Sequence, residues 1–238
     1  MKDKIVVQIP CLNEESTIGD VITQFKNKIR NTEIIVYDND SKDKSVEISK
    51  KHGVKVVTVM KRGKGNVVKR MFSDDLDANF FIMIDGDNTY DVHNISKLMK
   101  IMKNGNYDML VAKRIHSDPL AYRRGHIVGN KFFSKFVNLI FGKDVTDIFS
   151  GYRIFTKRFV KTFPQTSNGF EIEAELTIHA LEQGYKVGEF DCIYKARPLG
   201  SSSKLNTFKD GLKILKLIFI LIKDEKPLLF FSLVSIIF

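Results

Sequence analysis

The sequence has few cysteines, few prolines and no long hydrophobic run, and these absences exclude several classes of protein. Two cysteines, Cys11 and Cys192, are too few for a disulfide scaffold or a multi-cysteine zinc site, and they indicate a reducing compartment. With 5 prolines and 15 glycines in 238 residues, the chain is neither collagen-like nor of low complexity. The apolar run at residues 4–9 is too short for a signal peptide, which argues against export.

Positive charge is in excess, with 38 Lys and Arg against 28 Asp and Glu. The 43% apolar content predicts a globular protein rather than a disordered one. A net charge of +10 suits nucleic acid, anionic lipid or phosphorylated ligands. The basic residues are interleaved with acidic motifs, and no stacking motif or nucleic-acid-binding signature is present, so we expect no nucleic-acid partner.

Two hydrophobic periodicities alternate along the first half of the chain. Short β-branched runs predict strands at 4–9, 33–38, 54–59, 79–85 and 107–113, and helical spacing predicts helices at 15–29, 43–51, 63–72 and 94–103. Further helices are expected at 126–141 and 170–183, with a strand at 186–194. This alternation predicts an α/β fold with a mostly parallel central sheet, in which ligands bind beyond the carboxyl ends of the strands.

The segment after the fourth predicted strand, DGDNTYD at 85–91, carries the strongest chemical signal. Asp85 and Asp87 are two residues apart, and Gly86 permits a tight turn between them. Two carboxylates on such a turn can hold Mg²⁺ or Mn²⁺, with a diphosphate completing the coordination shell. We favour this metal site over an ordinary acidic turn.

The three earlier strands are followed by weaker signals. PCLNEE at 10–15 taken alone is an ordinary helix entry. Asp38, in YDNDSKDKS at 37–45, fits either a hydrogen bond to a nucleotide base or ribose, or a capped turn. KRGKGN at 61–66 combines glycines and cations at a helix start, which favours a phosphate, although the P-loop spacing is missing.

Together with TDIFSGYRIF at 146–155, GFEIEAEL at 169–176 and RPLGSSSKL at 197–205, these motifs resemble the family-2 glycosyltransferases, and among them the polyprenyl-phosphate branch typified by dolichyl-phosphate mannose and glucose synthases. The resemblance implies a GT-A-type, Rossmann-like nucleotide-sugar fold, with a catalytic domain at 1–205. It also implies a reaction: an inverting, metal-dependent transfer of a sugar from a nucleoside diphosphate, preferably UDP, to a membrane polyprenyl or dolichyl phosphate.

The same resemblance implies roles for individual residues. Those expected at the nucleotide are Pro10, Leu12, Glu14, Asp38, Arg62, Lys64, Gly65, Asp85 and Gly86, with Asp85 and Asp87 holding the metal. Those expected at the acceptor and leaving phosphates are Arg114, Arg124, Arg153, Arg197 and Lys204. The chain departs from the family pattern at Asn39, where an aspartate is common, and at Thr89, where a glutamine is common.

The type of acceptor decides whether a general base is needed. A phosphate monoester is largely dianionic at pH 7 and is already a nucleophile, so it needs cations to overcome repulsion rather than a base. A hydroxyl acceptor would need a carboxylate base, and Asp147 is the residue that we nominate for this alternative. Asp147 could equally pair with Arg153 and orient it. Asp87, Asp147 and Arg153 are thus the expected catalytic residues.

The composition changes after residue 205. Lys209, Lys213, Lys216 and Lys223 fall on one helical face of 206–223, and Leu212, Leu215, Ile218, Phe219 and Ile222 fall on the other. This pattern predicts an interfacial helix, and the apolar run at 228–238 is too short for the roughly 20 residues that span a bilayer. We expect 206–238 to associate with membrane lipid at the cytoplasmic face, the alternative being a core helix followed by a strand.

Overall fold

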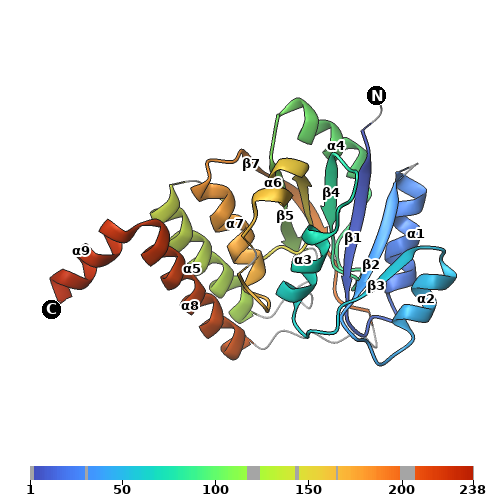
Figure 1. The fold of residues 1–238 in the computed structure, drawn as a ribbon, viewed down its shortest axis with the longest axis horizontal. Coiled ribbons are helices and arrows are strands. Elements are labelled where there is room, and N and C mark those ends of the chain that lie inside the picture. The colour runs from blue at the N-terminus through green and yellow to red at the C-terminus, as the bar shows by residue number, and fades with distance from the viewer. Residues whose placement is uncertain are drawn as a thin grey trace.

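The computed structural model describes residues 3–29, 32–116, 124–142, 145–164, 166–198 and 207–237 (Figure 1). The strands are β1 (Ile5–Cys11), β2 (Glu33–Asp38), β3 (Lys55–Thr58), β4 (Phe80–Met83), β5 (Met109–His116), β6 (Arg153–Thr156) and β7 (Val187–Tyr194). The helices are α1 (Ile18–Lys28), α2 (Ser45–Lys51), α3 (Lys64–Ser73), α4 (Ile95–Asn104), α5 (Arg124–Phe141), α6 (Lys157–Thr162), α7 (Ile172–Glu182), α8 (Thr207–Glu225) and α9 (Pro227–Ile237). Every predicted strand and helix is confirmed with small shifts at its ends. The described part of the final apolar run lies in the helix α9, so the alternative of a C-terminal strand is wrong.

The strands form a single seven-stranded sheet in the order β3-β2-β1-β4-β6-β5-β7. All pairings are parallel except those of β6, which lies antiparallel between β4 and β5. The prediction of a mostly parallel sheet is therefore confirmed. Because the other six strands share one direction, the loops that follow them gather at one edge of the sheet, where the acidic and glycine motifs lie.

Neither β6 nor α6 was expected from the sequence. β6 has only four residues, and α6 begins at the next residue without an intervening loop. The Thr156 hydroxyl accepts a hydrogen bond from the Phe159 backbone N–H and so caps α6. β3 and β4 are equally short but lie within longer apolar runs, whereas β6 offers only the two apolar residues Ile154 and Phe155.

Alternate residues of β1 supply the two faces of the sheet. Val7 and Ile9 pack with α1 and α4 on one face, whereas Val6 packs with α3, α6 and α7 on the other. Gln8 shares the second face, and its amide donates to the Tyr37 hydroxyl at 3.1 Å and to the Met71 carbonyl at 2.8 Å. Burial on both faces explains why the central strands are almost continuously apolar.

A third apolar cluster lies beside the sheet, where α5, α7 and α8 are side by side and α9 extends away from α8 (Figure 1). It corrects the prediction for α8. Ile218 and Ile222, expected to face lipid, are buried in this cluster with Ile214 and Leu217. Leu212 and Phe219 are exposed instead.

In the part of the chain that the structure describes, no helix has the length and apolar character needed to cross a membrane. The expected boundary between 205 and 206 lies outside the described residues.

Candidate active site

The DGD turn follows β4 at the carboxyl edge of the sheet, and both of its carboxylates are held by protein groups. The Asp87 side chain is 4% exposed, and its Oδ1 accepts from the Thr89 hydroxyl at 2.6 Å and from the Thr89 backbone N–H at 3.2 Å. Its Oδ2 lies 2.5 Å from Nη2 of Arg197, a residue that follows β7. Thr89, which departs from the family pattern, therefore orients Asp87. Gly86 ties the turn to the start of α1, because its carbonyl accepts from the Thr17 hydroxyl at 2.7 Å.

Asp85 has a different cation. Lys64 Nζ lies 2.5 Å from Asp85 Oδ1 and 2.6 Å from Glu173 Oε1, a carboxylate at the start of α7. Burial opposes the charge on Lys64, but the two carboxylates outweigh it and raise the pKa of Lys64 above its usual value. The backbone of Gly151 lies against the Asp85 carboxylate, since a Cβ at position 151 would stand 2.2 Å from Oδ2.

These residues are compatible with a divalent cation. Among the described residues, the carboxylates of Asp85 and Glu173 share Lys64, and those of Asp87 and Glu14 share Arg197, which lies 3.9 Å from Glu14 Oε1. Carboxylate oxygens are the ligands that Mg²⁺ and Mn²⁺ prefer. Within the described ranges, no three Asp, Glu, His or Cys side chains gather around a metal position. Asp85 and Asp87 would hold the ion together with oxygens of a bound diphosphate.

The loops after β1 and β2 are joined beside this turn. The backbone N–H groups of Asn13 and Glu14 donate to the hydroxyls of Ser41 and Ser45 at 2.9 and 2.8 Å. Pro10 is still part of β1 and pairs with Tyr37, and both Pro10 and Leu12 are half-buried. The residues predicted to line a nucleotide pocket from these two loops thus lie in one region.

Asp38 ends β2 and is 2% exposed. Its Oδ2 accepts from the Ser41 backbone N–H at 3.1 Å, whereas Oδ1 is buried and has no hydrogen-bond partner among the described residues. Such an atom is costly to bury unless a ligand satisfies it. The neighbouring Asn39 donates to the carbonyls of Val59 and Lys61 at 2.8 and 2.9 Å, which an aspartate carboxylate could not do.

The glycines of the RGKG loop are required by the protein itself. A Cβ at Gly63 would stand 2.1 Å from the Asn168 carbonyl oxygen, and one at Gly65 would stand 2.3 Å from that of Ser167. Gly63 also has a φ of +118°. The segment 167–169 therefore lies where the sequence suggested a phosphate. Arg62 reaches the loop after β2, where its Nη2 donates to the Asp40 carbonyl at 2.8 Å.

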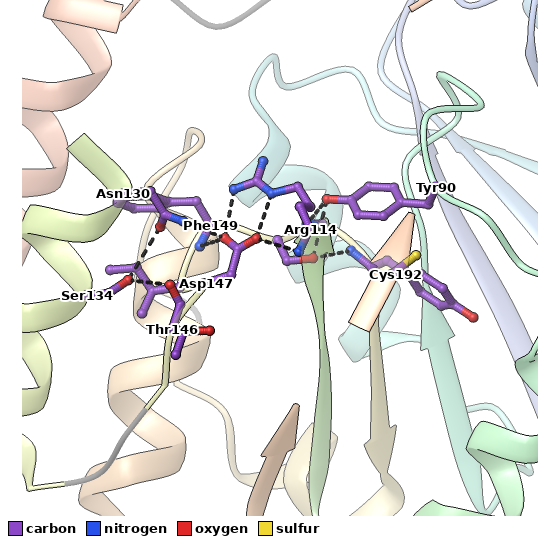
Figure 2. Close-up of polar contacts among 12 residues, drawn as sticks. Tyr90, Arg114, Asn130, Ser134, Thr146, Asp147, Phe149 and Cys192 are labelled. Atoms are coloured by element: carbon purple, nitrogen blue, oxygen red, sulfur yellow. Dashed lines mark hydrogen bonds and ion pairs between the residues drawn. The ribbon is translucent and has the colours of Figure 1, made fainter. Parts of the chain in front are cut away.

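Arg114, near the end of β5, is paired with Asp147 (Figure 2). Its Nε lies 2.7 Å from Asp147 Oδ2 and its Nη2 lies 2.7 Å from Oδ1, a bidentate arrangement, and Asn130 of α5 donates to the same Oδ1 at 3.1 Å. Burial raises the pKa of Asp147, but the guanidinium outweighs it and the pKa lies below its usual range. The sequence had suggested a pairing of Asp147 with Arg153, but its partner is Arg114.

Arg153, the first residue of β6, is wholly buried. Its guanidinium donates to the carbonyls of Ile148, Ser150 and Glu173 and to the hydroxyl of Thr177, at 2.7 to 2.9 Å. Burial lowers its pKa to about 10. These bonds leave it no path to a phosphate in this structure, so its expected role at the acceptor is corrected to a structural one. Of the other acceptor candidates, the Arg124 side chain and all of Lys204 lie outside the described residues.

Sequence reasoning missed three residues that shape the site, namely Tyr90, Gly151 and Glu173. The Tyr90 hydroxyl accepts from the Gly151 backbone N–H at 2.8 Å and so fixes the loop that packs on Asp85. A signal for Glu173 was present. Glu171, Glu173 and Glu175 alternate within the apolar stretch GFEIEAEL, and carboxylates are seldom placed in such a setting unless they have partners.

Comparisons with known proteins agree on the family. The model described as "Glycosyl transferase family 2" matches residues 6–163. The chain is 32% identical over 234 residues to Glycosyltransferase AglJ of Haloferax volcanii, covering 98% of this chain and 77% of that protein. It is 26% identical over 224 residues to a dolichyl-phosphate hexose transferase of the same organism, covering 94% and 96%. Its fold matches glucosyl-3-phosphoglycerate synthase of Mycobacterium tuberculosis, solved with phosphoglyceric acid, with a TM-score of 0.73 at 18% identity, covering 93% and 79%.

Proposed function

Because the chain belongs to glycosyl transferase family 2 and is a glycosyltransferase with a GT-A-like fold, we propose that it transfers a sugar from a nucleoside diphosphate to the phosphate of a membrane polyprenol, with inversion at the anomeric carbon. UDP is the preferred nucleotide. The product is a lipid-linked sugar that serves as a donor for glycan assembly.

The state of Asp147 is the observation that carries the choice of acceptor. Both of its oxygens are occupied by Arg114, and its lowered pKa makes it a weak proton acceptor. Asp147, the base nominated for a hydroxyl acceptor, is therefore poorly suited to that role. A phosphate acceptor needs none, and it is attracted to cations such as Arg114 and Arg197. The name of the dolichyl-phosphate hexose transferase relative supports the same acceptor class.

The nucleotide would enter between the loops after β1, β2 and β4. Asp38 Oδ1, which is buried and has no described partner, is an acceptor suited to an N–H donor of the base. Asp85 and Asp87 would hold Mg²⁺ or Mn²⁺, which neutralises the leaving diphosphate when bound. Arg197 already contacts Asp87, so it stands where it can move to a phosphate of the departing nucleotide.

Membrane contact is proposed for the exposed side of α8 and for α9, at the cytoplasmic face of the membrane. Leu212 is 55% and Phe219 50% exposed, and Lys213, Lys216 and Lys223 are exposed along the same helix. Apolar side chains beside lysines suit the headgroup layer of an anionic membrane. Replacing Leu212 and Phe219 with serine should reduce flotation of the purified protein with anionic liposomes. Unchanged flotation would contradict the proposal that this side of α8 binds the membrane.

Transfer itself is tested with a panel of nucleotide sugars and a short polyprenyl phosphate in the presence of Mn²⁺. We expect a product whose sugar is released by mild acid, because it is linked through phosphate. Asp87→Ala or excess EDTA should abolish transfer while circular dichroism shows an unchanged fold. An acid-stable product would favour a hydroxyl acceptor. Full activity in EDTA would refute the dependence of transfer on a metal ion.

A further inference from the structure

Lys64 joins two carboxylates that come from distant parts of the chain. Its ammonium lies between Asp85 of the DGD turn and Glu173, which is 109 residues away in the sequence. The Lys64 side chain is 9% exposed, that of Glu173 is 6% exposed and that of Asp85 is 24% exposed. Asp85 is thus the member of this group that is best able to reach a ligand, and the other two lie behind it.

The position of Lys64 is itself tightly fixed. The flanking Gly63 and Gly65 allow the segment 167–169 to lie against the start of α3, where the Gly65 backbone N–H donates to the Gly169 carbonyl at 3.1 Å. Glu175 holds the preceding residues, because its carboxylate accepts from the backbone N–H groups of Thr166 and Ser167 at 2.7 and 2.8 Å. The ammonium therefore has little freedom to follow Asp85 if that carboxylate turns.

Asp85 is confined on a second side by Gly151, whose backbone leaves no room for a Cβ beside the carboxylate. One oxygen is bonded to Lys64 and the whole group abuts Gly151, so the direction of the carboxylate is set before any ligand arrives. Groups that orient a metal-binding carboxylate in this way commonly change metal affinity when they are removed.

We propose that Lys64 and Glu173 are positioning residues for Asp85: Glu173 holds the ammonium, and the ammonium holds the carboxylate in the direction that binds the metal–diphosphate group. This inference rests on the proposed function. Neither residue takes part in bond making or breaking, so their effect should appear in the metal-dependent part of nucleotide binding.

The test compares the wild type with Lys64→Met and with the double variant Lys64→Met/Glu173→Leu. The single variant leaves Glu173 buried without its cation and is expected to be unstable, whereas replacing the buried pair with apolar residues should restore the fold. Calorimetry then measures the affinity for UDP, with GDP as the alternative nucleotide, in Mn²⁺ and in EDTA. Asp108→Asn, which weakens a buried carboxylate's pairing with Arg158 just before β5, at the edge of the sheet away from the site, is the control for lost stability.

For the wild type and Asp108→Asn we expect tighter nucleotide binding in Mn²⁺ than in EDTA. In the folded double variant this gain should shrink by about 10- to 100-fold, with the affinity in EDTA unchanged. A double variant that keeps the full gain would overturn the inference and make the pair purely structural. A wild type that gains nothing from Mn²⁺ with either nucleotide would refute the proposed metal site, and the inference with it.

Discussion

Replacing Gly151 with alanine tests the geometry of Asp85 directly. An alanine Cβ would stand 2.2 Å from Asp85 Oδ2, 2.7 Å from Cγ and 2.8 Å from Oδ1. A carbon and an oxygen that are not bonded need well over 3 Å, so the carboxylate must move by about 1 Å. Lys64 on Oδ1 and the anchoring of Gly151 by the Tyr90 hydroxyl both resist an easy adjustment.

We expect Gly151→Ala to reduce kcat/KM for transfer by about 100-fold, because a shift of this size at a catalytic group has that order of effect. The fold should survive, since the displaced atoms are the end of a side chain that is 24% exposed and not part of the apolar core. The loss of unfolding free energy should therefore stay within the about 1–3 kcal/mol that overpacking usually costs.

The assay is initial-rate transfer with the best sugar nucleotide of the panel, alongside a thermal melt. Gly129→Ala in α5 is the matched control, because a Cβ there meets no described atom within 4 Å, and it should keep wild-type activity. A Gly151→Ala protein that melts normally and transfers sugar at a rate within threefold of the wild type would show that the direction of Asp85 does not matter to the reaction.

Two further changes probe Asp147 and His179. Asp147→Asn removes the charge that faces Arg114 and should lower the unfolding free energy by about 3 kcal/mol in urea titration, since it breaks a buried ion pair. The transfer rate should depend on pH in the same way in this variant and in the wild type. A fall in the wild-type rate at low pH that disappears in the variant would instead identify Asp147 as a general base. Burial lowers the pKa of His179 below its unfolded value, with Glu175 opposing, so the unfolded chain takes up the proton first as the pH falls. The wild type should therefore lose stability below about pH 6.5, and His179→Phe, which suits the surrounding rings of Phe159, Phe163 and Tyr185, should flatten that dependence in melts from pH 7 to pH 5.

The sequence predicted the edge of the sheet well because its signals there are local. Asp38, Asp85 and Asp87 each lie at or just beyond the end of an apolar strand, and parallel strands bring such ends together. The pairing of Lys64 with Glu173 depends on how α7 packs against α3, which no local pattern encodes. The glycines on either side of Lys64 were a clue to close packing, but a ligand and a chain segment make the same demand on a glycine.

Arg153 shows that a role implied by a family resemblance depends on where the fold places the side chain. The motif FSGYRIF is part of that resemblance, which implied a place for Arg153 at a phosphate. In the structure Arg153 begins β6, which lies antiparallel between β4 and β5. Its guanidinium points into the protein and joins the carbonyls of Ile148 and Ser150 to that of Glu173. An arginine with that many buried carbonyl partners organises the loop that carries Asp147 and Gly151, and so affects the site without touching a substrate.

Helix α8 shows what helical periodicity cannot predict. The periodicity separates two faces of the helix but does not say what covers each face. The lysine side was predicted to face solvent or lipid headgroups, and Lys213, Lys216 and Lys223 are exposed. The apolar side is divided: Ile218 and Ile222 complete the core with α5 and α7, and Leu212 and Phe219 remain outside beside the lysines. Deleting the helix would uncover that core as well as remove the proposed lipid contact, so loss of activity on deletion would not distinguish the two. Substitution of the exposed apolar residues alone separates them, because it leaves the buried side of the helix intact.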